Sequence, residues 1–156
     1  MGLFAFSACA LFAQQKSGPK PTQTDLPYLL EADKLIPTEA QTVTRSGSKD
    51  DETLSVKGSA SKARTPLPEP IFLFSAGKIS PENFELIRFQ VSSSQRQWNR
   101  KQQSNPNSIE PDEPLRLTLR PVGNGVTRIE AAEMLSPGEY ALMPRGGDTA
   151  FCFTVF

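Results

Sequence analysis

Hydrophobic and polar residues alternate over several short stretches of this chain, which is the pattern of half-buried β-strands. The clearest example is residues 115–120, where leucine at every second position alternates with arginine or threonine. Residues 54–57 and 87–91 show the same period of two. Residues 71–74 (IFLF) instead have four consecutive large apolar side chains, which predicts a central strand buried on both faces.

Turn-forming residues separate these stretches at close intervals. Residues 121–125 (PVGNG) contain an Asn-Gly pair, which suits the positive φ angles of a hairpin turn. Residues 136–138 (SPG) predict a tight turn before the next strand. Residues 80–83 (SPEN) have a capping serine followed by proline, which predicts one helical turn.

The remaining segments fit the same organisation. Residues 28–36 predict an opening hairpin, and the β-branched residues within 41–45 favour a continuation of its second strand past the intervening proline. Alternate prolines in residues 66–70 predict a rigid, extended connection, whereas residues 130–135 (EAAEML) are compatible with either a short helix or an extended segment. We expect an all-β fold, an immunoglobulin-like β-sandwich of about seven to nine short antiparallel strands with at most one or two short helical turns.

The first thirteen residues differ in composition from the rest of the chain. Residues 1–13 (MGLFAFSACALFA) carry no charge, and their length is below the ~20 residues that a membrane-spanning helix requires. They resemble the apolar part of a signal peptide cleaved after Ala13. Two alternatives remain open, a lipoprotein acylated on Cys9 and an apolar element of the domain itself. A polar tether over residues 14–25 and a single β-sandwich domain over residues 26–156 would then follow.

Composition restricts the chemistry that the chain could perform. It has no histidine, 17 basic and 17 acidic residues, and two cysteines. A histidine-based nucleophile pair or metal site is excluded, and zero net charge disfavours a nucleic-acid binder. We expect no catalytic residues, no cofactor and no metal, although a carboxylate-based hydrolase needs only Asp and Glu. Cys152, between two phenylalanines, is expected to be a buried structural residue.

Residues 135–142 (LSPGEYAL) carry a recognisable motif. Pro137 and Gly138 would make the turn, and Tyr140 would bury its ring while its hydroxyl reaches a backbone group, as in a tyrosine corner. This motif resembles the ending of many bacterial immunoglobulin-like and transthyretin-like surface modules.

The same motif together with residues 151–153 (FCF) resembles a group of exported bacterial proteins of uncharacterised activity that end in PGEYA, a variable hairpin and FCF. An opening hairpin similar to residues 28–38 recurs in that group. This chain departs from the pattern at residues 153–156, where a glycine and an acidic residue would be usual. The resemblance implies a β-sandwich and export, and it implies no catalytic mechanism.

One polar segment is a candidate interaction site. In residues 96–101 (RQWNRK), Arg96, Trp98 and Arg100 share one face of an extended backbone, with Lys101 directly after them. An exposed tryptophan beside arginines suits a protein interface or a stacking platform for a ligand. Alternatively, Trp98 closes one end of the core and the arginine side chains cover its edge.

The sequence therefore supports two functional hypotheses. The first is an exported, periplasmic or surface-located, non-enzymatic interaction or structural module, with protein partners in the cell envelope or with itself. In this hypothesis the protein is an accessory subunit of an envelope or extracellular assembly and touches the membrane only through an N-terminal anchor. The second is a carbohydrate- or peptide-binding module that uses Trp98 with Arg96 and Arg100.

Overall fold

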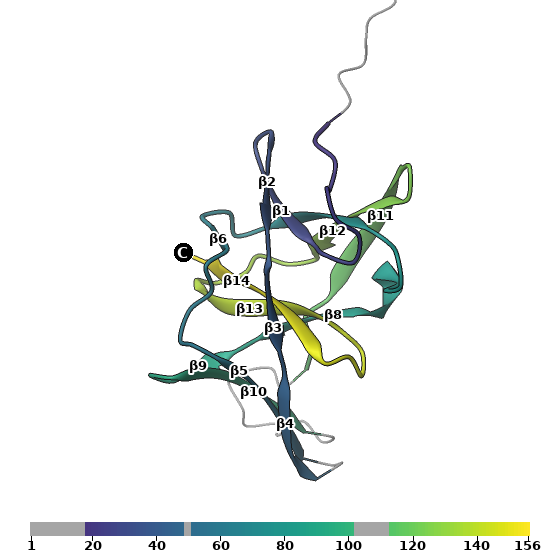
Figure 1. Ribbon diagram of the computed structural model, residues 1–156. Coiled ribbons are helices and arrows are strands. Elements are labelled where there is room, and N and C mark those ends of the chain that lie inside the picture. Colours follow the sequence, from purple (N-terminus) through teal and green to yellow (C-terminus); the bar gives the residue numbers. More distant parts are fainter. Residues whose placement is uncertain (1–17, 49–50, 102–112) are drawn as a thin grey trace, which may run out of the picture.

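The computed structural model describes residues 18–48, 51–101 and 113–156. These residues form fourteen β-strands and one 3-10 turn, η1 (Pro81–Asn83). The strands lie in three stacked sheets, as Figure 1 shows from top to bottom. All neighbouring strands are antiparallel except for one short parallel pair. The expected all-β, sandwich-like fold is confirmed.

Each sheet combines strands that are distant in the sequence. The first sheet has the order β11 (Leu117–Gly123), β12 (Val126–Ala131), β7 (Ile71–Ser75), β1 (Tyr28–Glu31), β2 (Lys34–Pro37). The central sheet has the order β3 (Glu39–Thr42), β14 (Thr149–Val155), β13 (Gly138–Pro144), β8 (Phe84–Arg88), with β6 (Arg64–Thr65) parallel to β14. The third sheet has the order β4 (Thr44–Ser48), β5 (Asp51–Lys57), β10 (Gln95–Lys101), β9 (Gln90–Val91).

The central sheet is covered on both faces, so the protein has two cores. In the first core, apolar side chains of the central sheet pack against the first sheet, and the Phe72 and Phe153 rings meet edge to face at 4.9 Å. In the second core, the opposite face of the central sheet packs against Leu54, Val56 and Trp98 of the third sheet. This explains why β13 and β14 are apolar at nearly every position rather than at every second one.

Residues 34–48 pass along one side of all three layers as β2, β3 and β4 (Figure 1). The chain changes sheet at two buried residues. The backbone amide and the hydroxyl of Thr38 both donate hydrogen bonds to the Pro27 carbonyl. The Val43 amide donates to the backbone carbonyl of Asp148. The chain remains extended past Pro37, but the expected continuation of the second hairpin strand is wrong, because β2 ends at Pro37 and β3 and β4 belong to two other sheets.

The strand count is higher than the seven to nine strands expected, because one extended run is divided among several sheets and several pairings are only two residues long. The helical turn at Pro81–Asn83 is confirmed, as are the positive φ angles of Asn124 (54°) and Gly125 (72°) in the β11–β12 hairpin. Residues 130–135 contain no helix, since β12 continues to Ala131. Among the described residues no helix is long and apolar enough to span a membrane.

The end of the expected tether is bound to the domain. Thr24 forms a β-bridge with Ser75, and the Asp25 carboxylate accepts backbone hydrogen bonds from Gly77, Lys78 and Ile79. Backbone hydrogen bonds, with that from Lys78 the largest contribution, lower the pKa of Asp25. Residues 1–17, and with them the expected signal peptide and Cys9, lie outside the described residues.

Candidate functional site

The candidate interaction segment lies on β10, in the middle of the third sheet. Three of its four expected site residues, Arg96, Trp98 and Arg100, point toward the central sheet, because each contacts residues of that sheet. Arg96 is 0% exposed and Trp98 is 5% exposed. The Lys101 backbone pairs with Asp51, and its side chain lies outside the described structure.

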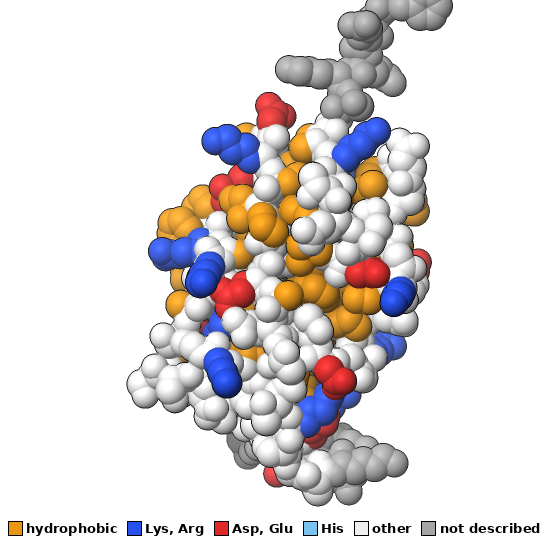
Figure 2. Space-filling view, in the orientation of Figure 1, with side chains coloured by type: hydrophobic (Ala, Val, Ile, Leu, Met, Phe, Trp, Pro, Cys, Tyr) orange, Lys and Arg blue, Asp and Glu red, His pale blue; other side chains and the backbone are white. Residues whose placement is uncertain are grey.

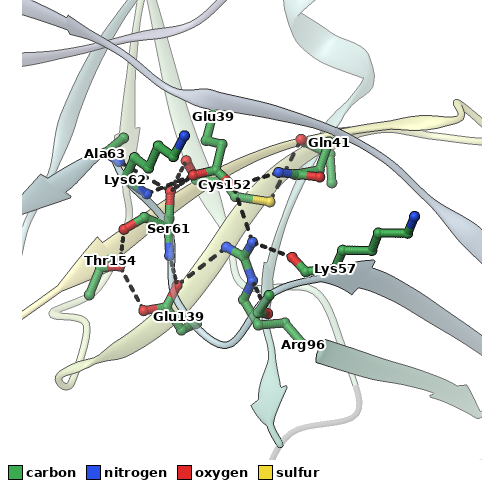
Figure 3. A network of polar contacts seen from close by, with 12 residues as sticks. Glu39, Gln41, Lys57, Ser61, Lys62, Ala63, Arg96, Glu139, Cys152 and Thr154 are labelled. Carbon is green, nitrogen blue, oxygen red and sulfur yellow. Dashed lines mark hydrogen bonds and ion pairs between the residues drawn. The ribbon is translucent and has the colours of Figure 1, made fainter. Parts of the chain in front are cut away.

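The guanidinium of Arg96 is enclosed by acceptors (Figure 3). Its Nη2 donates to Glu39 at 3.2 Å and to the Lys57 carbonyl at 2.9 Å. Its Nη1 donates to Glu139 at 3.4 Å, and its Nε donates to the Gly58 carbonyl at 3.1 Å. Burying an unpaired charge is costly in free energy, and these four contacts offset that cost for Arg96.

Both carboxylates of this cluster have further donors. Glu139 accepts from the Ser61 amide at 2.9 Å and from the Thr154 hydroxyl at 2.6 Å. Glu39 accepts from the Lys62 amide at 2.7 Å and from Gln41 at 2.6 Å. The five side chains Arg96, Glu39, Glu139, Ser61 and Thr154, which we call the buried arginine cluster, thus connect β10 and residues 57–63 to the central sheet.

The electrostatics of the buried arginine cluster favour a structural role. Burial raises the pKa of Glu39, but hydrogen bonds from the Lys62 amide, Gln41 and Arg96 outweigh it, so that the pKa is lowered below its usual value. A general acid at neutral pH needs a raised pKa. Glu39 is therefore suited to hold Arg96 rather than to transfer a proton to a substrate.

Trp98 belongs to the second core, together with residues such as Ile87 and Met143. The Arg100 guanidinium lies 5.6 Å from the centroid of the Trp98 ring and forms two hydrogen bonds with Glu85, at 3.0 and 3.1 Å. This arrangement matches the interpretation in which Trp98 closes the core and an arginine side chain covers its edge. The burial of Arg96 and Trp98 gives no support to ligand stacking on this segment.

The tyrosine contact that the motif led us to expect is present before β13. The Tyr140 hydroxyl donates to the Ser136 carbonyl at 2.7 Å, and the ring is buried. The ring stacks on Phe153 with centroids 5.7 Å apart and an interplanar angle of 21°. Pro137 lies at a bend and Gly138 begins β13, so the chain enters the central sheet directly after Pro137.

Cys152 lies within β14 and its side chain is buried in the second core. Burial raises the pKa of its thiol to about 12; Arg96 acts in the opposite direction, and Glu39 and Glu139 add to the rise. A nucleophilic or redox-active cysteine requires a lowered pKa and access to solvent. Cys152 has neither in this structure.

The pattern of exposure identifies a surface that the sequence did not. Three large apolar side chains are well exposed at one end of the first core, Leu67 at 39%, Met134 at 70% and Phe156 at 57%. Backbone hydrogen bonds hold their segments side by side, from Phe156 to the Thr65 carbonyl and from Leu135 to the Pro68 carbonyl. We call the three residues with Arg64, whose guanidinium lies 4.6 Å from the centroid of the Phe156 ring, the C-terminal apolar surface.

Figure 2 shows hydrophobic side chains with basic ones beside them at the edge where Figure 1 places the C-terminus. The signal in the sequence was Leu67 itself, a large apolar residue between Pro66 and Pro68. Such a residue must either be buried or remain exposed on a stiff segment, and one sequence does not say which.

A second surface feature is a hollow of about 430 Å³ between the β8 edge of the central sheet and β11. Charged side chains of both signs line it, and Glu85 forms ion pairs with both Arg100 and Arg145. Within the lining, Glu85 and Arg145 are therefore already bonded to each other and are not both available to a ligand.

No protein-family model, no curated protein and no solved structure matches this chain. The description of the protein therefore rests on its fold and its candidate site. It is an all-β protein of three layers, with a buried arginine between two of them.

Proposed function

We propose that the protein is an exported, non-enzymatic interaction or structural module, an accessory subunit of a bacterial envelope or extracellular assembly. The observation that carries the interaction role is the C-terminal apolar surface. Export is supported by the apolar, uncharged residues 1–13. The resemblance to exported β-sandwich proteins supports the same location.

Exposed apolar side chains that cluster, as opposed to those scattered singly, commonly mark an interaction site. Leu67, Met134 and Phe156 are three of the five large hydrophobic residues that are exposed in the described ranges. The other two, Val91 and Val122, belong to separate strands of the third and first sheets. The enrichment on one surface therefore favours docking of a protein there.

The backbone under this surface is stiff, which lowers the entropic cost of binding. Proline restricts φ at residues 66, 68 and 70, and the hydrogen bonds from Phe156 and Leu135 fix the segment at two points. Arg64 is held over the Phe156 ring and adds a charged edge to the apolar centre. Apolar centres with a polar rim are the usual composition of protein interfaces.

The proposal is tested by cross-linking mass spectrometry on membrane and periplasmic fractions of bacteria that produce the full chain. We expect cross-links from the exposed Lys62, next to this surface, to another polypeptide or to a second copy. Met134→Asp should abolish them. Val122→Asp, at a residue 53% exposed on the β11–β12 hairpin, is the matched control and should leave them unchanged. Recovery of the unlinked monomer alone would contradict the proposal.

A further inference from the structure

We infer that the partner at the C-terminal apolar surface is a second copy of this chain, bound about a two-fold axis that passes close to Leu67. This inference rests on the proposed interaction function and specifies its partner. It follows from the distribution of charge around the apolar residues.

Exposed charges of opposite sign lie at the two ends of the segment that carries Leu67. Lys62 and Arg64 precede it, and Glu69 follows it, all with exposed side chains. The exposed Glu133 belongs to the same end as Glu69, because the Leu135 amide is bonded to the Pro68 carbonyl. Along this segment the exposed side chains thus run from a basic end, through the apolar Leu67, to an acidic end.

A surface of this kind is complementary to itself. In a two-fold symmetric dimer the same surface of each subunit makes the contact, and the rotation places the basic end of one copy against the acidic end of the other. Arg64 of each copy would then face Glu69 of the other, and the two Leu67 side chains would meet near the axis. A partner with a surface of a single sign of charge would repel one of the two ends, so this kind of partner is disfavoured.

The apolar middle is small, so we expect a weak dimer with a micromolar dissociation constant, on the order of 1–100 μM. Sedimentation equilibrium on the purified full chain over this concentration range measures it directly. Arg64→Glu and Glu69→Arg should each weaken self-association about tenfold or more, because each single variant places like charges opposite one another twice. Both residues are exposed, so unchanged thermal unfolding verifies that the variants fold.

The decisive measurement mixes the two single variants. In a heterodimer of Arg64→Glu with Glu69→Arg, both contacts again join opposite charges, so the mixture should associate within about threefold of the wild type. The double variant should recover in the same way. Every variant keeps residues 1–13 unchanged, so association through that apolar segment would be insensitive to the exchange of charges.

Three results would overturn the inference. The first is a monomer at all concentrations, the second a dimer that the single variants do not weaken, and the third a mixture that associates no better than its components. If the purified chain is monomeric while cross-links from Lys62 still reach a different polypeptide in the envelope, the proposed function stands. The inference that the partner is a second copy of this chain is then wrong. If neither association exists, both are wrong.

Discussion

Arg96 on β10 and Glu139 on β13 form an ion pair across two layers of the protein, at 3.4 Å, with the arginine side chain fully buried. Glu39 on β3 completes the pairing from the edge of the central sheet. Removing one partner of such a group leaves a buried charge without compensation, which costs far more than the pair contributes when intact.

Replacing Arg96 by alanine should therefore destabilise the protein by about 3–5 kcal/mol, because Glu39 and Glu139 would lose their shared cation. Urea unfolding followed by circular dichroism measures the change. Arg145→Ala is the matched control, since its ion pair with Glu85 has the arginine side chain 67% exposed and should contribute less than about 1 kcal/mol. Equal effects of the two substitutions would contradict a special role for the buried arginine cluster.

The same cluster should make stability depend on pH in the acidic range. The pKa of Glu39 is lowered in the folded protein, so its contribution to stability is complete above its unfolded pKa and is lost as pH falls through the folded pKa. We expect the free energy of unfolding to decrease between about pH 5 and about pH 3. The pKa of Asp25 is also lowered and adds a decrease of the same sign.

Glu39→Gln separates these two contributions, because it removes the Glu39 carboxylate and leaves Asp25 intact. The variant should be less stable than the wild type at neutral pH and should lose less stability on acidification. Chemical unfolding at a series of pH values provides the comparison. If the free energy of unfolding of the variant falls with pH as steeply as that of the wild type, Glu39 does not contribute to the pH dependence of stability.

The local features of the fold could be predicted from the sequence, but the arrangement of its sheets in three layers could not. These features involve neighbouring elements: the strand within residues 115–120 pairs with the next strand along the chain, the Asn124-Gly125 turn joins the two, and Tyr140 bonds to Ser136. The third layer was missed, although β14 carries its signal: apolar side chains on both of its faces, the large Phe151 and Phe153 on one and the small Ala150 and Cys152 on the other. Assigning the second face requires knowing which distant strand covers it.

The buried arginine cluster could not be predicted for the same reason. Arg96 lies 57 residues from Glu39 and 43 residues from Glu139 along the chain. Its proximity to Trp98 in the sequence suggested a shared exposed surface, but pairing of β10 with β5 turns both side chains toward the central sheet. A charged residue in a strand is normally placed in solvent by sequence reasoning, and only the partners reveal that this one is buried.

Cys152 should be chemically inert in the folded protein. Its thiol is buried and its pKa is raised to about 12, so the reactive thiolate is scarce at about pH 8. Alkylation followed by peptide mass spectrometry distinguishes Cys152 from Cys9, the second cysteine of the chain. We expect labelling of Cys152 only after denaturant has unfolded the protein. Rapid labelling of the native protein would show that the second core opens to solvent.

Trp98 provides the measurement that separates the two functional hypotheses, because it is the single tryptophan of the chain. With its indole 5% exposed, the native protein should emit at short wavelength, and unfolding should shift the emission to longer wavelength. A panel of glycans and peptides should leave the native emission unchanged, since Arg96 is engaged by four acceptors and Trp98 is enclosed in the second core. Arg100→Ala is a useful comparison, because it removes the guanidinium beside the ring and opens its edge. A ligand that shifts the wild-type emission, and loses this effect in Arg100→Ala, would contradict the core role of Trp98 and favour a binding module over an interaction module.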